Sequence, residues 1–102
     1  MTEKPITVVA TLHLWPQHQD KALEAMAACI LASRQETTNS GYHCRRDAHD
    51  PHCFVFIEHW ASVAAIHEHE KTPHFLAMKQ VLNKALSKPM DVRLLEDTDL
   101  LP

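Results

Sequence analysis

The order of apolar and polar residues predicts an α+β fold, with helices against one face of a four-stranded antiparallel sheet. Three observations lead to this expectation. Residues 6–14 and 53–60 are rich in β-branched and aromatic side chains, which are typical of strands. Residues 19–37 carry apolar side chains at helical spacing. The polar stretch 48–51 separates two strand-like segments as a hairpin turn does.

The first strand is predicted over residues 6–14, between Pro5 and Pro16. Successive side chains of a strand point to opposite faces. One face here would carry Val8, Ala10, Leu12 and Leu14, and the other Thr7, Val9, Thr11 and His13. Because both faces are mostly apolar, we expect this strand to be covered on both sides.

The first helix is predicted over residues 19–37, with Asp20 placing negative charge near its start. Its apolar face would consist of Leu23, Met26, Ala27, Ile30 and Leu31. The run 37–41 (TTNSG) is expected to end the helix, because short polar side chains compete for backbone hydrogen bonds.

A β-hairpin is predicted from strands at 42–47 and 53–60, and the apolar run 54–57 should make its second strand central in the sheet. Ser62 is expected to cap a short helix that ends near residue 69.

A second helical segment is predicted to begin at Thr72 and Pro73, because proline is tolerated in a first turn. Its apolar face would consist of Phe75, Met78, Leu82, Ala85 and Leu86. Pro89 ends it, and residues 90–95 form the last strand.

The resulting order is βαββαβ, a ferredoxin-like arrangement that places both helical segments on one face of the sheet. The other face stays open and carries apolar side chains, which favours a homodimer of C2 symmetry joined sheet to sheet. We expect one domain over residues 1–102, since no repeat or low-complexity segment interrupts the chain.

The composition is that of a globular protein, with 45% hydrophobic and 23% charged residues. A formal net charge of −3 and the lack of a basic run argue against nucleic acid and membranes as partners. The longest apolar run, 25–32, is far shorter than the about 20 residues that span a bilayer. The start lacks a signal-peptide pattern, and three cysteines match no disulfide framework, so reduced thiols in the cytoplasm are expected.

A recognisable pattern begins at the end of the predicted central strand. The string Glu58-x-Trp60 is followed by a short helix, by His69 nine residues after the tryptophan, and by the tetrapeptide 72–75 (TPHF). This pattern resembles the antibiotic biosynthesis monooxygenase family, and the likeness extends over residues 6–95.

The resemblance implies a dimeric α+β barrel with a pocket in each subunit between sheet and helices. Members that resemble this sequence include quinol monooxygenases and isomerases of phosphorylated autoinducers. The family's haem-degrading branch uses an asparagine on the first strand and a haem-ligating histidine on the last long helix. Leu12 and Lys79 stand at the matching positions, so haem degradation is not expected.

Five residues are candidates for a site. Glu58 and Trp60 share a strand face, where a carboxylate beside an indole could act as a base or orient a histidine, and the indole could hold the substrate. His69 and His74 flank the helix break, and either could take a phenolic proton near neutral pH. Tyr42 could donate to a substrate oxygen. Each also has a purely structural alternative: core packing, ion pairing or fixing the helix break.

No metal site is expected. His67 and His69 are two residues apart and so point to different faces of a helix, whereas ligand pairs prefer a spacing of four. His49, His52 and Cys53 crowd the hairpin turn and could trap a metal adventitiously.

The resemblance implies a monooxygenase that oxidises a small electron-rich aromatic such as a quinol with O2. The sequence has no flavin, nicotinamide or haem motif and a single glycine, so we expect the enzyme to be cofactor-independent and the substrate to supply the electrons. The alternatives are an isomerase or lyase on a small phosphorylated sugar-like or hydroxy-ketone signal molecule, and a non-catalytic dimeric stress-response barrel. A cation in the pocket, from Arg45, Arg46 or Lys79, would favour an anionic substrate. Apolar pocket walls would favour an aromatic substrate. A filled pocket would favour the non-catalytic barrel.

Overall fold

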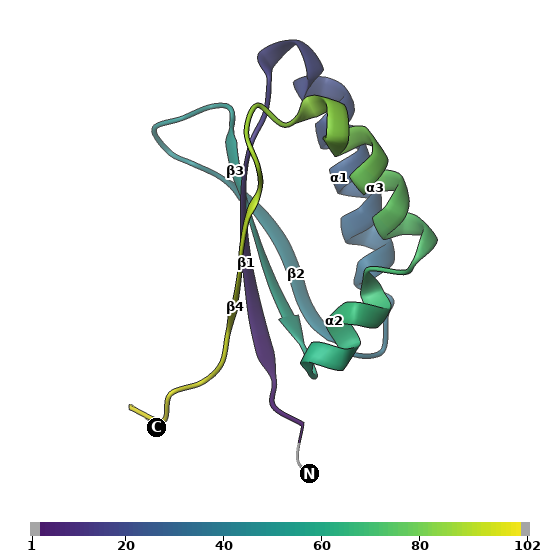
Figure 1. Ribbon diagram of the computed structural model, residues 1–102, viewed down its shortest axis with the longest axis vertical. Coiled ribbons are helices and arrows are strands. Elements are labelled where there is room, and N and C mark those ends of the chain that lie inside the picture. Colours follow the sequence, from purple (N-terminus) through teal and green to yellow (C-terminus); the bar gives the residue numbers. More distant parts are fainter. Residues whose placement is uncertain (1–2, 101–102) are drawn as a thin grey trace.

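A computed structural model describes residues 3–100 of the protein (Figure 1). In chain order the elements are β1 (Ile6–His13), the 3-10 helix η1 (Pro16–His18), α1 (Gln19–Ser33), β2 (Asn39–Arg46), β3 (Cys53–Trp60), α2 (Val63–His69), α3 (Pro73–Ala85) and β4 (Asp91–Leu95). The helices form one layer and the sheet forms the other. No helix within the described residues is long and apolar enough to span a membrane.

The sheet has four strands in the order β2-β3-β1-β4, and every neighbouring pair is antiparallel. β1 and β3 are therefore central, and for β3 this is the position that the apolar run in the hairpin predicted. The crossovers from β1 to β2 and from β3 to β4 place all three α-helices on the same face. The structure thus confirms the predicted ferredoxin-like α+β fold.

Two side-chain caps divide the second helical segment where the sequence predicted a break. Ser62 Oγ accepts a 3.0 Å hydrogen bond from the backbone N–H of Ala65 at the start of α2. Thr72 Oγ1 accepts from the N–H of Phe75 at 3.3 Å, and it donates to the carbonyl of His69 at 2.6 Å. These bonds satisfy N–H groups that lack a partner in the first turn of a helix, and they fix the end of α2 relative to α3.

The first helix ends at Ser33, earlier than the predicted residue 37. The backbone N–H groups of Gln35 and Glu36 bond to carbonyl oxygens three residues back, at 3.1 and 3.0 Å, which is the tighter spacing of a turn. Those turns leave the helix early enough for the chain to start a strand at Asn39.

β2 begins at Asn39, three residues before the predicted start. Asn39 pairs with Trp60 and Gly41 with His59, so one residue bulges out of the ladder. The Asn39 side chain supports the bulge by donating to the carbonyls of Gly41 and His59 at 3.0 and 3.1 Å. A Cβ atom at Gly41 would lie 2.8 Å from the His59 ring, so glycine fits here without displacing it.

The last helix ends at Ala85, before the expected stop at Pro89. The carbonyl of Ala85 accepts from the N–H of Trp15 at 2.8 Å, and the N–H of Ser87 donates to the carbonyl of His13 at 2.8 Å. The N–H of Leu86 is the last to bond to the preceding helical turn, at the carbonyl of Leu82, and from Ser87 on the chain bonds to the end of β1 instead.

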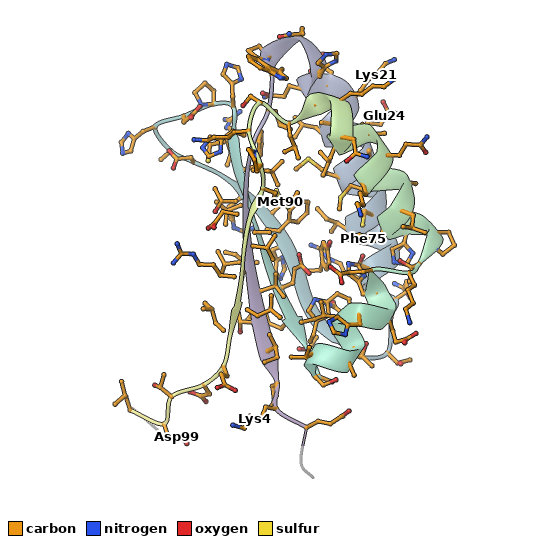
Figure 2. All side chains as sticks on the ribbon, in the orientation of Figure 1. Lys4, Lys21, Glu24, Phe75, Met90 and Asp99 are labelled. Carbon is orange, nitrogen blue, oxygen red and sulfur yellow. The ribbon has the colours of Figure 1, made fainter. Side chains whose placement is uncertain are left out.

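The core lies between the sheet and the helices, and partly buried side chains such as Phe75 and Met90 pack against it (Figure 2). Ile6, Val8, Ala10 and Leu12 of β1 are buried in it. The alternate residues of β1 are only half-buried, because no helix of this chain covers that side of the sheet. The chain by itself therefore covers one face of β1 and leaves the other, mostly uncharged, face partly exposed.

Candidate functional site

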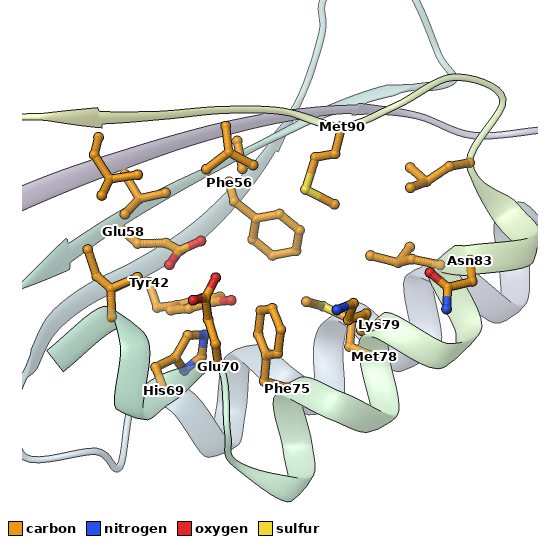
Figure 3. A pocket seen from close by; sticks show the side chains of 17 residues that line it. Tyr42, Phe56, Glu58, His69, Glu70, Phe75, Met78, Lys79, Asn83 and Met90 are labelled. Atoms are coloured by element: carbon orange, nitrogen blue, oxygen red, sulfur yellow. The ribbon is translucent and has the colours of Figure 1, made fainter. Parts of the chain in front are cut away.

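A cavity of about 440 Å³ lies between the inner face of the sheet and helices α2 and α3 (Figure 3). Its walls are mainly apolar, and the ionisable or polar side chains that line it are Tyr42, Glu58, His69, Glu70, Lys79 and Asn83. Three of the five candidate residues, Tyr42, Glu58 and His69, therefore line one cavity. Trp60 and His74 are adjacent to these residues but are not among the lining side chains.

Glu58 lies on the inner face of β3, directly opposite Tyr42 on β2 and Val8 on β1. Alternation along β3 puts Trp60 on the same face, and its indole N–H donates a 2.8 Å hydrogen bond to Glu58 Oε1. Burial raises the pKa of Glu58 to about 7, the Trp60 hydrogen bond opposes the rise, and Glu70 and Glu36 add to it. A carboxyl group with this pKa can give or take a proton near neutral pH.

Trp60 is 2% exposed and lies behind His69, with ring centroids 4.4 Å apart and planes tilted by 38°. The sequence argument expected the indole to contact a substrate directly. In the structure it instead supports two residues that reach the cavity: it donates to Glu58 and packs against the His69 ring.

His69 is the last residue of α2, and its ring lines the cavity although the residue is only 2% exposed. Its Nδ1 lies 2.7 Å from Glu36 Oε2, and its Nε2 is buried with no hydrogen-bond partner among the described residues. Burial lowers the pKa of His69, although the hydrogen bond and charge of Glu36 oppose that shift. His69 is therefore neutral near pH 7 and can accept a proton.

His74, in the first turn of α3, contacts the same carboxylate oxygen from the other side. Its Nε2 lies 2.9 Å from Glu36 Oε2, and its ring centroid is 5.8 Å from that of His69. The His74 side chain is 22% exposed, against 2% for His69. The two histidines that the sequence singled out thus have different positions, with His69 on the cavity and His74 nearer the surface.

Sequence reasoning did not single out Glu36. It falls within the predicted helix 19–37, where a glutamate is ordinarily a solvated surface residue. The helix ends at Ser33, and the following turn brings residue 36 against the break between α2 and α3. The TTNSG run beside it marked a chain reversal but gave no sign of which side chains would meet there.

Tyr42 is 1% exposed and packs edge-on against Phe56 and His69, with centroid distances of 5.6 and 5.5 Å. Its hydroxyl lies 3.9 Å from Cys29 Sγ on α1. Burial and the charge of Glu58 raise the pKa of Tyr42 well above its ordinary value. Tyr42 therefore stays protonated and keeps an O–H group that can donate a hydrogen bond.

Glu36, His69 and His74 offer nitrogen and oxygen atoms that all lie within 4.8 Å of one another. Two ligands of a tetrahedral zinc ion, each about 2.0–2.1 Å from it, stand roughly 3.3 Å apart. The observed separations of 2.7 and 2.9 Å are shorter and match hydrogen bonds between imidazole and carboxylate. The three side chains as placed form a hydrogen-bonded triad. At the hairpin turn, where the sequence suggested that a metal could be trapped adventitiously, the His52 ring forms a hydrogen bond with the side chain of Gln19.

Of the three possible pocket cations, Lys79 lines the cavity and Arg45 and Arg46 do not. Lys79 and Asn83 lie on α3, where Lys79 is next to Met78 beyond Phe75, and Asn83 is further still from Glu58 and His69 (Figure 3). Within the described residues no carboxylate forms an ion pair with Lys79. The cavity thus combines two titratable side chains, Glu58 and His69, with apolar walls and with Lys79, its one cation among the described residues.

Known proteins are similar to this chain in sequence and in fold. The family model for antibiotic biosynthesis monooxygenases matches residues 5–81. The protein YcnE of Bacillus subtilis (strain 168), named provisionally as a monooxygenase, is 28% identical over 87 residues, which are 85% of this chain and 92% of YcnE.

Solved structures agree with this relationship. The crystal structure of PA3566 from Pseudomonas aeruginosa superposes with a TM-score of 0.86 at 28% identity and covers 96% of this chain and 98% of its own. A crystallised antibiotic biosynthesis monooxygenase gives a TM-score of 0.87 at 29% identity, covering 91% and 98%. The chain belongs to the antibiotic biosynthesis monooxygenase family, as its Glu58-x-Trp60 pattern indicated.

Proposed function

We propose that this protein is a cofactor-independent monooxygenase that oxidises a small electron-rich aromatic, such as a quinol, with O2. The observation that carries the proposal is the presence of Glu58 and His69 on one cavity with mainly apolar walls. One group has a pKa near 7 and the other is a neutral imidazole, so the pair can move protons at neutral pH. The apolar walls suit an aromatic ring.

In the proposed reaction the substrate supplies all the electrons. His69 takes the proton of a ring hydroxyl, and the resulting anion is a far better reductant toward O2. A carbon–oxygen bond forms and Glu58 protonates the peroxide. The oxygenated ring carbon then loses its hydrogen as a proton, the C–H electron pair forms the carbonyl, and the O–O bond breaks as water leaves. For a naphthoquinol the products are a hydroxynaphthoquinone and one water, which balances the atoms and the four electrons that O2 takes up. The Tyr42 hydroxyl is the proposed donor to the substrate oxyanion.

A second candidate function, an isomerase or lyase acting on a small anionic hydroxy-ketone, is favoured by one observation. Lys79 lies on the cavity wall without a carboxylate partner among the described residues. A phosphorylated substrate would place its anion there and its reacting carbon near Glu58. The third reading, a non-catalytic barrel, is less well supported because the cavity is open rather than filled.

We also propose that the chain forms a homodimer through the outer face of its sheet. Val9, Val55 and Ile57 lie on that face and are only half-buried, because the helices cover the other side. A second copy would remove this apolar surface from water.

Oxygen consumption tests the proposed chemistry. Purified protein should consume O2 with reduced naphthoquinone faster than the quinol's own autoxidation, in the presence of a chelator. Glu58→Gln and His69→Ala should lose most of this excess rate, and His67→Ala, which changes an exposed histidine on the same helix, should keep it. No excess over autoxidation with any of a panel of quinols and anthrones would sink the monooxygenase proposal. Turnover of a phosphorylated hydroxy-ketone that Lys79→Met weakens through KM would then establish the second candidate.

A further inference from the structure

The carboxylate of Glu36 lies between two imidazole rings. Its Oε2 is 2.7 Å from Nδ1 of His69 and 2.9 Å from Nε2 of His74. A carboxylate oxygen accepts hydrogen bonds and donates none, so both ring nitrogens donate to it. A neutral His69 therefore carries its proton on Nδ1, and its Nε2 presents a lone pair.

That Nε2 atom is buried and has no hydrogen-bond partner among the described residues, although the His69 ring lines the cavity. Burying a polar nitrogen without a partner costs free energy, so unpaired atoms of this kind are uncommon outside sites that bind something. A hydroxyl group of a molecule in the cavity would supply the missing donor. His69 Nε2, the atom that lacks a partner, is also the atom that receives the substrate's hydroxyl proton in the proposed reaction.

We propose that Glu36 is a positioning residue that fixes the tautomer and orientation of His69, and that His74 holds Glu36 in place. This inference rests on the proposed function, in which His69 is the base. A base oriented by a carboxylate through its second nitrogen is the arrangement that activates hydroxyl groups in several enzyme classes.

The charge of Glu36 also has a part in the proton transfer. When Nε2 takes the substrate proton, the O–H bond breaks, its electron pair stays on the oxygen, and His69 becomes an imidazolium. The hydrogen bond that Nδ1 already donates to Glu36 then becomes charge-assisted and stronger. This strengthening needs no rearrangement, because the carboxylate is already 2.7 Å away.

The surroundings of His69 leave this task to Glu36. Glu70 acts on His69 only through its charge, and His74 opposes protonation. Three aromatic rings pack around the imidazole, those of Tyr42, Trp60 and Phe75, at centroid distances of 5.5, 4.4 and 5.0 Å. None of them carries a negative charge that could stabilise an imidazolium as Glu36 does. Glu58 shares the cavity, but its Oε1 accepts from the Trp60 indole.

Nitrogen-15 NMR of the imidazole rings tests the positioning role without any turnover, so it gives an answer even if the proposed oxidation is wrong. Comparison with His69→Gln identifies the His69 signals. At pH 8 the wild-type protein should show His69 protonated on Nδ1. Glu36→Leu removes the acceptor that holds the proton on Nδ1, so the Nε2-protonated tautomer should become more populated. A wild-type His69 protonated on Nε2, or a tautomer unchanged by Glu36→Leu, would overturn the proposal.

Kinetics test the consequence. Glu36→Gln should lower kcat by about 10–100-fold with little change in KM, since positioning of a base acts on the chemical step. The ionisation of His69 in the rate profile should move to lower pH, because the carboxylate that raises its pKa is gone.

The role of His74 is tested by a pair of variants. His74→Ala should lower kcat less than Glu36→Gln does, and His74→Gln should restore part of the loss, because its amide N–H can replace the ring Nε2–H. His67→Ala is the matched control and should behave as wild type. Equal rates for His74→Gln and His74→Ala would show that His74 does not act by donating to Glu36.

Discussion

The indole nitrogen of Trp60 lies 2.8 Å from Oε1 of Glu58, and both residues are buried on the helix-facing side of β3. This hydrogen bond stabilises the charged form of a carboxylate whose burial disfavours charge. The balance leaves the pKa of Glu58 at about 7 instead of its ordinary 4.5. We therefore expect the titration of Glu58 to make both the stability and the activity of the protein depend on pH.

Replacing Glu58 with Gln should stabilise the protein above neutral pH and remove most of its activity. A raised folded-state pKa means that the folded protein holds this proton more tightly than the unfolded chain. The free energy of unfolding therefore falls as pH rises from about 4.5 to about 7, and the full penalty applies above that window. Gln carries no charge and can still accept from Trp60.

Thermal or urea unfolding at several pH values measures this effect. The gain of Glu58→Gln over wild type should be small at pH 4.5 and should grow to at most about 3 kcal/mol at pH 8. Protonation of buried His69 in acid affects both proteins alike and cancels from the difference. A constant difference across this range would mean that Glu58 does not titrate as described.

Trp60→Phe should shift the pH dependence of activity toward higher pH. The variant keeps an aromatic ring in the core but loses the N–H that lowers the pKa of Glu58, so this pKa should rise above about 7. The measurement is the pH profile of kcat/KM. Trp15→Phe, at a residue that is 46% exposed, is the control and should leave the profile unchanged.

Thr72→Val should loosen the junction between α2 and α3. Valine has the shape of threonine but cannot accept from the Phe75 N–H or donate to the carbonyl of His69. We expect a loss of about 0.5–2 kcal/mol in the free energy of unfolding. Thr72→Ser retains the hydroxyl and should lose less, and equal losses for the two variants would contradict a role for the hydroxyl.

Ile57→Lys should convert the proposed homodimer to a monomer, because it places a charge at the centre of the outer sheet face. Sedimentation equilibrium should give the chain mass of 11.6 kDa for the variant and about twice this value for the wild type. Leu31→Lys, at an exposed position on α1, is the matched control and should remain dimeric. A wild-type protein of 11.6 kDa at micromolar concentration would exclude the homodimer.

Much of the fold was predictable because local patterns and the tertiary structure agree. The bounds of β3 and the Ser62 and Thr72 caps match the expectations. The errors lie at element ends, where long-range pairing competes with local preference. β2 starts at Asn39 because that residue pairs with Trp60, and no local signal near residue 39 reports such a pairing.

Sequence alone determined that Glu58 and Trp60 share a strand face, because alternation along a strand is a local rule that needs no partner. It also determined a break in the helical segment between His69 and His74, because the capping residues are adjacent in the chain. Only the tertiary structure decided that Glu36, 33 residues before His69, bonds to both histidines. It likewise placed Trp60 behind His69 and Lys79 on the cavity wall. Such contacts depend on how far each element runs and on the packing of the helices against the sheet, and no spacing along the chain encodes them.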